Sequence, residues 1–561
     1  MLIVIVFVCS IFMFYNLNES ERWSVTIQNK KVELQPLQEG DIPQNPENTL
    51  FIAVGQDQED TFGQIFSNVC RHLEDLSLPY ERRGYVSGWE LDPHSMVLIL
   101  CSNTISDHMD PQVLEQFIKK GGKAVLAAGI SSGNEDAYLD PVLGLVEKTV
   151  SFNPTGLHFP RDYFPVQDEV MGYNGYVIST WVSLREKAEI YAEDSEKHTP
   201  IIYSYPYGAG ETLVLNGTYL ADQRCIGMLT AGLSVLLEDF MYPVLGLEHI
   251  YLDNFPLATN ADDASCLKLY GRTTEAFVRD IVWPSLQGIS VRNGIKYTSS
   301  VLAVSTIPES FPSISEGLFT TMGKSALQFD VELAYASFSN GSGELYAHQD
   351  FIERFHSVFK NYNVSSLITT GHDNIPQAVD FVGEEIHAVR GDLRSQDVKA
   401  RLWEGPDYFV FPCGTEGTEL DQGTMLEIAS LYAGYGMLSH KLDINNFVDM
   451  HAGAPVWDTE KRKLAEFEER VLSRFKGLDK KTLSGSLNPV RSYLNLNFSQ
   501  VRTDDTWEIL CDDFIPGQSF LVHTKKEFSG AEGAELQKVG SNYYMVRVMA
   551  PRAVLHLAKG A

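Results

Sequence analysis

The chain has 561 residues and a formal net charge of −30, from 74 acidic and 44 basic side chains. Its length exceeds what one hydrophobic core accommodates, so we expect two to four domains. The negative surface repels phosphate backbones, which argues against nucleic-acid binding; it favours a cationic partner, such as a polymer with free amino groups, or serves solubility alone.

Residues 1–15 are almost wholly apolar, and the first cationic side chain is Arg22. The run is shorter than the roughly 20 residues of a spanning helix and lacks the basic flank of a signal peptide. It predicts a signal or membrane anchor over 1–20 and a polar stalk over 21–48. A buried helix of a cytoplasmic protein is the alternative. On the signal or anchor interpretation, we expect an extracytoplasmic protein, membrane-anchored or secreted, at the cell surface.

Residues 49–247 alternate short apolar strands with amphipathic helices, which predicts an α/β domain with a parallel sheet. Asp110-Pro111 begins one helix, with Asp as the N-cap and Pro at the first helical position. The expected strands are 50–54, 96–101, 123–128 and 211–216, and the expected helices 62–76 and 226–237. The architecture resembles the flavodoxin-like, class I amidotransferase-like module. Cys101 lacks the glycine-flanked elbow of an amidotransferase nucleophile, so we expect no catalysis here.

Residues 248–485 continue the strand–helix alternation and predict an irregular (β/α) barrel. Its expected strands are 249–252, 295–304, 365–369, 408–411 and 437–442, and its expected helices 273–283, 351–359, 425–435 and 460–475. In residues 486–561 short strands at 493–498, 507–510, 520–522 and 543–548 predict a small β-sandwich.

The seven cysteines form no Cys-x-x-Cys pair, which argues against a zinc knuckle and a dense disulfide framework. Cys70, Cys101, Cys225 and Cys413 have apolar neighbours and are predicted to be buried. One or two disulfides remain an open alternative.

Two adjacent carboxylates, Asp262 and Asp263, follow the first expected barrel strand. In a parallel barrel the chemistry lies where strands end. Metal-dependent amide hydrolysis needs one carboxylate to hold the cation and another to take a proton from water. A solvated turn or a helix cap is the alternative role for such a pair.

The stretch from this pair through 295–304 (IKYTSSVLAV) resembles the NodB-like polysaccharide deacetylases, in particular the PelA-type domain. The resemblance implies Asp262 as the base and Asp263 as a metal ligand. A rival placement is Asp253-Asn254, directly on the first strand, with Asp253 contacting substrate. The distance to the next strand favours the later pair.

The family's two metal-binding histidines lie four residues apart, and this sequence has Ala336 and Asn340 at those positions. Neither is a good ligand for a zinc-like ion. Glu344 and His348 have the same spacing and are predicted to restore the site in a shifted register.

His440, in Leu-Ser-His, resembles the family's closing Leu-x-His, which implies the acid that protonates the leaving amine; a hydrogen-bonded core histidine is the alternative. The resemblance also implies that Arg390 orients the base and that His372 reaches the substrate.

Two functions follow. The first is metal-assisted deacetylation of an N-acetylated amino-sugar exopolysaccharide, with a zinc-like divalent cation. The second is polysaccharide binding, or scaffolding of exopolysaccharide synthesis and export proteins, by a catalytically inactive relative that needs no cofactor.

Overall fold

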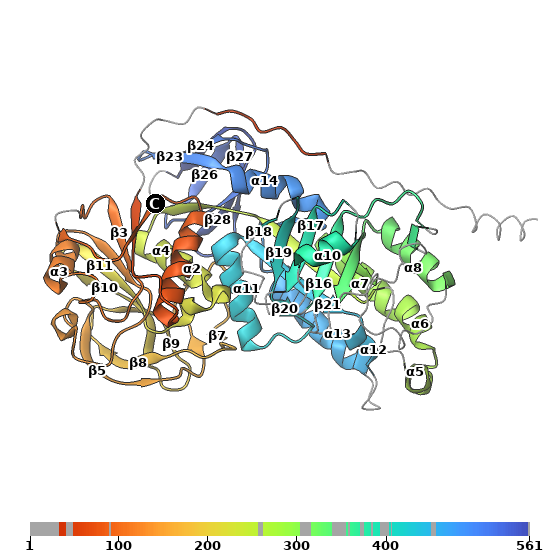
Figure 1. Cartoon of the computed structure of the whole chain (residues 1–561), viewed down its shortest axis with the longest axis horizontal. Helices are drawn as coiled ribbons and strands as arrows, with labels where there is room; N and C mark the ends of the chain where they lie inside the picture. The colour runs from red at the N-terminus through yellow and green to blue at the C-terminus, as the bar shows by residue number, and fades with distance from the viewer. Residues whose placement is uncertain are drawn as a thin grey trace, which may run out of the picture.

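The structure is a computed structural model. It describes residues 33–40, 49–88, 91–255, 262–302, 316–338, 355–356, 359–370, 375–382, 385–392, 403–405, 407–449 and 456–558. These residues form a mixed α/β molecule with a nine-stranded sheet, a ten-stranded barrel-like sheet and two four-stranded sheets (Figure 1). The α/β class is therefore confirmed.

The first sheet has five parallel strands, four of which were predicted; the edge strand β2 was not. Their order is β2 (Tyr80–Arg83), β1 (Leu50–Val54), β3 (Met96–Leu100), β4 (Lys123–Leu126) and β11 (Gly210–Leu215). This is the 2-1-3-4-5 order of flavodoxin-like folds. The strands are apolar on both faces because α2 (Thr61–Asp75) and α4 (Gly227–Leu237) cover one face and α3 (Pro111–Lys119) the other. Asp110 caps α3 as predicted, accepting from the backbone N–H of Gln112 at 2.9 Å.

Beyond β11 the sheet continues with antiparallel strands, which the sequence reading missed. They are β10 (Pro200–Tyr207), β9 (Glu189–Asp194), β6 (Leu157–His158) and β7 (Val170–Met171). A two-stranded sheet, β5 (Leu145–Phe152) with β8 (Ser179–Leu184), lies beside them. The β10–β11 turn contains Gly208 at φ +66°, a conformation that favours glycine. The domain is thus a mixed sheet, not a purely parallel one.

The barrel-like sheet is parallel except for the short β18 (Trp403–Glu404). Its parallel strands are β13 (Leu247–Asp253), β14 (Tyr297–Leu302), β15 (Glu332–Phe338), β16 (Ser366–Thr370), β17 (Ala388–Asp392), β19 (Phe409–Cys413), β20 (Thr415–Glu416), β21 (Met437–Asp443) and β22 (Asp479–Lys480). The two edges of the sheet nearly meet. Strand β19 lies next to one edge, and after a single residue the chain continues into β20, which pairs with β21 at the other edge.

Helices surround this barrel on its outer side. They are α5 (Asp263–Tyr270), α6 (Thr274–Phe277), α7 (Trp283–Asn293), α8 (Glu316–Gln328), α10 (Ile375–Val382), α11 (Gln422–Tyr435), α12 (Asn445–Val448) and α13 (Val456–Phe467). A short π-helix, η5 (Val278–Val282), joins α6 to α7, and another, η6 (Glu468–Leu472), extends α13.

The C-terminal part is a β-sandwich with its own core, as predicted, and it is preceded by α14 (Leu487–Asn495). One sheet is β12 (Phe240–Val244), β25 (Gln518–His523), β28 (Tyr543–Val548) and β27 (Ala534–Lys538). The other is β23 (Asn497–Arg502), β24 (Thr506–Asp512), β29 (Arg552–Leu557) and β26 (Phe528–Glu532).

Two details of this part differ from the prediction. The strand prediction for 493–498 is wrong in its first half, which belongs to α14. In that helix Leu487, Val490 and Tyr493 are buried at helical spacing. Strand β12 precedes the barrel in sequence yet pairs with β25. Residues 33–40, predicted as stalk, lie along the same unit, where Gln38 bridges to Phe514 (Figure 1).

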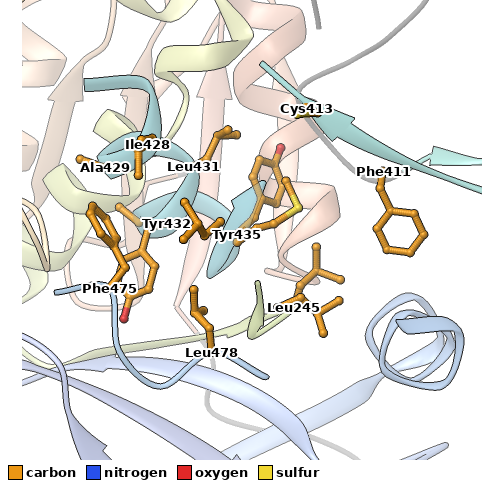
Figure 2. Packing of buried hydrophobic residues seen from close by; sticks show 14 of the residues in the cluster. Leu245, Phe411, Cys413, Ile428, Ala429, Leu431, Tyr432, Tyr435, Phe475 and Leu478 are labelled. Atoms are coloured by element: carbon orange, nitrogen blue, oxygen red, sulfur yellow. The ribbon is translucent and has the colours of Figure 1, made fainter. Parts of the chain in front are cut away.

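The first sheet domain and the barrel pack through α4 and α11. The backbone N–H of Gly227 donates to the Ser430 hydroxyl at 3.0 Å, and the Tyr435 hydroxyl donates to Asp75 at 3.1 Å. Figure 2 shows Tyr432 beside Phe475 in this core, and one hydrophobic cluster includes residues of both units. The domain boundaries and the independent folding of 248–485 stay predictions.

The predicted burial of Cys70, Cys101, Cys225 and Cys413 is confirmed, and all four are unpaired thiols. Burial raises the pKa of Cys101 well above its usual value, which fits the absence of a nucleophile elbow. The apolar segment 1–15 lies outside the described residues. Within the described part of the chain, none of the helices has the length and hydropathy needed to cross a bilayer.

Candidate functional site at the carboxyl ends of the barrel strands

The centre of the site is an ion pair between β13 and β17. Arg390 donates from its two terminal nitrogens to the two carboxylate oxygens of Asp253, at 2.6 and 2.9 Å. Both residues are buried. Burial alone would lower the pKa of Arg390, but the Asp253 carboxylate, together with Cys413 and Tyr251, outweighs burial and raises it. The guanidinium also lies 5.1 Å from the centre of the Tyr251 ring. Arg390 is therefore charged and fixes both oxygens of Asp253, the placement that the resemblance implied for a base and its arginine.

A second set of charges surrounds this pair at the same strand ends. The Lys441 ammonium lies 3.5 Å from Asp392 and 2.5 Å from Glu416. Asp443, at the end of β21, accepts from the Asn254 side chain at 2.9 Å. Burial raises the pKa of Asp443, although the hydrogen bond from Asn254 opposes the shift. This arrangement places acceptors and one cation at the mouth of the barrel.

The strand register places the expected histidine position on the same wall. Ala336 pairs with Ile368, and Ile368 pairs with Arg390, so their side chains share one face of the sheet. Ala336 is fully buried and its methyl group has no electron pair to donate. Asn340 lies outside the described residues.

Asn254 occupies the second position of the rival carboxylate pair, where the family resemblance implies a metal ligand. Its backbone is left-handed at φ 57°, and its N–H donates to the Ser300 hydroxyl at 3.0 Å. A neutral amide replaces a carboxylate here, and Ala336 replaces a histidine. Among the described residues there is no group of three or more His, Cys, Asp or Glu side chains that could hold a metal ion. This donor set therefore does not fit the metal that the fold family implies.

Asp262 and Asp263 lie elsewhere. Asp262 caps α5, accepting from the backbone N–H of Ser265 at 3.1 Å, and Asp263 accepts from the N–H of Thr274 at 2.8 Å. Asp263 is exposed, and Figure 1 shows α5 at the edge of the molecule, away from the barrel strands. The structure brings Asp253, not this later pair, beside Arg390. These contacts favour the rival placement at Asp253, because sequence distance cannot tell a strand end from the cap of the next helix; the roles of Asp262 and Asp263 stay predictions.

His440 points to the opposite side of its strand from Lys441. Its Nε2 donates to the Gly417 carbonyl at 2.7 Å, its Nδ1 lies 2.9 Å from the Thr415 hydroxyl, and its ring stacks on Phe467 at 4.4 Å between centres. Burial lowers the pKa of His440 to about 4. These contacts favour the core-histidine alternative over the predicted acid.

Glu344, His348 and His372 lie outside the described residues, so their roles stay predictions. The sequence reading missed Lys441, Asp443 and Asp392. Their signal was present in the alternation of β21, where Ser439, Lys441 and Asp443 are polar and Leu438 and Leu442 apolar. That alternation indicates which face of the strand turns inward.

A protein-family model matches residues 53–334, half of the chain. The chain belongs to DUF2194, described as uncharacterised proteins conserved in bacteria. No curated protein matches the sequence.

The fold of this DUF2194 member is shared by a solved structure. The crystal structure of Agd3, described as a carbohydrate deacetylase, aligns with a TM-score of 0.54 over 91% of this chain and 99% of its own, at 10% identity. A ThuA-like protein from Bacteroides uniformis aligns with 35% of the chain at a TM-score of 0.27 and 14% identity, covering 93% of its own length. A β-galactosidase from Bacillus circulans sp. alkalophilus aligns with 35% of this chain and 34% of its own length, at a TM-score of 0.26 and 14% identity. The fold is therefore that of Agd3 over nearly the whole chain.

Proposed function

We propose that this protein binds an amino-sugar polysaccharide at the carboxyl ends of its barrel strands. The observation that carries the proposal is the Asp253–Arg390 pair, fixed at the mouth of a barrel of the Agd3 fold. In such barrels the strand ends hold the ligand site. The proposed ligand is an exopolysaccharide of N-acetylated amino sugars, in keeping with the resemblance to deacetylases.

The polar groups around the pair suit a sugar. Carboxylates accept hydrogen bonds from hydroxyl and amide N–H groups, and the Lys441 ammonium donates to hydroxyl or acetyl oxygens. Asp443 and Lys441 are only partly buried, so both reach solvent at the mouth. The described polar groups can therefore hydrogen-bond a sugar without a bound metal ion.

Amide hydrolysis is the second candidate, and one observation favours it. Arg390 holds the Asp253 carboxylate in a fixed orientation, as a general base requires. The missing ligands would have to come from Glu344 and His348, after β15, and from His372, after β16. Because the described donor set does not fit a metal, we derive no step through one.

Affinity for an N-acetylglucosamine oligomer, measured with and without Zn²⁺, separates the candidates. Binding that needs no metal, with no acetate released, supports the first. Lys441→Met and Asp443→Asn should each weaken it by roughly tenfold, the equivalent of about 1.4 kcal/mol, in variants whose thermal unfolding shows a folded chain. Lys296→Met, which removes an exposed cation, is the control. Release of acetate with about one bound metal establishes the second candidate, and no binding to any amino-sugar oligomer ends both.

We further propose that this occurs outside the membrane, together with exopolysaccharide synthesis or export proteins. The apolar segment 1–15 supports that location. A reporter fused after Asn48 should be active only on the extracytoplasmic side, and cytoplasmic activity would contradict the proposal.

A further inference from the structure

A large polar cavity lies where the first sheet domain meets the barrel. Its volume is about 850 Å³, and it is lined by Thr155, by residues 168–170 and 172–174 around β7, by residues 420–423 where α11 begins, and by Arg470. Ligand sites favour such junctions and range from roughly 300 to 1,000 Å³. Arg470 forms an ion pair with Asp168, and Tyr173 lies half-buried in the wall. The wall offers donors, acceptors and an aromatic ring, as a sugar site requires.

A second cavity, of about 450 Å³, adjoins the barrel mouth. It is lined by residues 416–419, by Asn446 and Asp449, and by Val456, Glu460 and Lys463 of α13. Glu416 belongs to this lining and also contacts Lys441 of the barrel mouth at 2.5 Å. The cavity therefore begins where the proposed binding site ends.

The same loop and the same helix line both cavities. Thr418 donates to Glu460, Glu419 contacts Lys463 at 3.1 Å, and Arg470 donates to the Leu420 carbonyl at 3.4 Å. The loop 416–423 thus runs beside α13 and η6 from one cavity to the other. Arg470 follows Glu460 by ten positions along α13 and η6, a rise of about 15 Å. This length suits an oligomer rather than one sugar.

The cavity walls carry mostly negative charge. The smaller cavity has four carboxylates (Glu416, Glu419, Asp449 and Glu460) and one cation, Lys463. The larger has three (Asp168, Glu169 and Asp421) and one cation, Arg470. Side chains of Glu169 and Glu419 are 84% and 77% exposed, so a ligand can reach both carboxylates, although Glu419 lies 3.1 Å from Lys463. A cleft lined by one sign of charge attracts the opposite sign.

We infer that the two cavities form one groove that binds an amino-sugar oligomer leading away from the barrel mouth, with a preference for sugars carrying free amines. This inference rests on the proposed function and refines its ligand to an oligomer of amino sugars in which some amines are free rather than N-acetylated. An ammonium group would bring a positive charge beside a carboxylate at either cavity, whereas an uncharged N-acetyl group can only donate one hydrogen bond to it.

The test uses the full chain and four probes: dimers and hexamers of glucosamine and of N-acetylglucosamine. The groove variant is Glu169→Gln with Glu419→Gln. The matched control is Glu532→Gln with Glu535→Gln, which removes two charges of 76% and 68% exposure from the C-terminal unit. We expect the wild type to bind the glucosamine hexamer more tightly than the other three probes. The groove variant should lose about tenfold for that hexamer, equivalent to about 1.4 kcal/mol, with the control within twofold of wild type.

Each alternative result is distinct. Equal losses in the groove variant and its control would mean general attraction to an acidic surface and would overturn the groove. Unchanged affinity and length preference in the groove variant would also overturn the groove, but would leave the proposed binding at the barrel mouth intact. If wild type binds none of the four probes, the proposed function itself fails.

Discussion

The two carboxylate oxygens of Asp253 accept hydrogen bonds from two nitrogens of Arg390 at 2.6 and 2.9 Å, across residues 137 positions apart in the sequence. Each side chain is the other's main source of charge compensation, since both are buried. A buried charge that loses its partner is strongly destabilising, because its desolvation is no longer offset.

Arg390→Met should therefore lower the free energy of unfolding by about 3–5 kcal/mol. The double variant Asp253→Asn with Arg390→Met should recover part of that loss, because it removes the orphaned carboxylate. Urea unfolding measures both. The control is Arg82→Met, whose pair with Asp57 is exposed, and it should cost less than about 1 kcal/mol. Equal costs at the two sites would contradict the structural account.

Glu248 should make stability depend on pH. Burial raises its pKa from 4.5 to about 7, against the opposing charge of Lys480. Between these pH values the folded chain holds a proton that the unfolded chain has lost, so the free energy of unfolding falls as pH rises. The decrease attributable to this group is on the order of 3 kcal/mol.

Glu248→Gln should remove this dependence. In chemical unfolding, the free energy of unfolding of the variant relative to wild type should therefore increase from pH 4.5 to 8. Glu532→Gln, at an exposed carboxylate, should follow the wild-type profile. A constant difference between Glu248→Gln and wild type at every pH would show that Glu248 does not titrate in this window.

His440→Ala tests whether this histidine is structural. Loss of the buried ring, its stacking on Phe467 and its bond to Gly417 should lower the free energy of unfolding by about 2–4 kcal/mol. Affinity for the N-acetylated dimer should change less than twofold, because the ring faces away from Lys441. If acetate release is detected in wild type and vanishes in a folded His440→Ala protein, the predicted acid role is restored.

The contact between α4 and α11 should tolerate no side chain at Gly227. A Cβ there would lie 1.8 Å from the Ser430 carbonyl oxygen, a backbone atom that cannot move aside. Gly227→Ala should cost about 1–3 kcal/mol or more through overpacking. Gly288→Ala, within α7, meets only the flexible end of Arg292 at 3.2 Å and should be neutral or stabilising by up to about 1 kcal/mol. Thermal unfolding compares the two, and equal midpoints would refute the tight packing.

The sequence by itself determined the local elements. The apolar run 50–54 became β1 with the predicted bounds, and Asp110-Pro111 began α3. Such signals are local, since propensity, capping and burial of a short run need no knowledge of distant chain. In the barrel, the five expected strands correspond to β13, β14, β16, β19 and β21, whereas β15 and β17 were not predicted.

Only the tertiary structure decided which residues meet. Side chains alternate along a strand, so one position separates Lys441, at the barrel mouth, from His440, in the core behind it. The choice between Asp253 and Asp262 depended on where the strand ends, and the pairing of β12 with β25 joins segments nearly 280 residues apart. These outcomes follow from register and long-range packing, which the free energy of the whole fold sets and a local pattern does not contain.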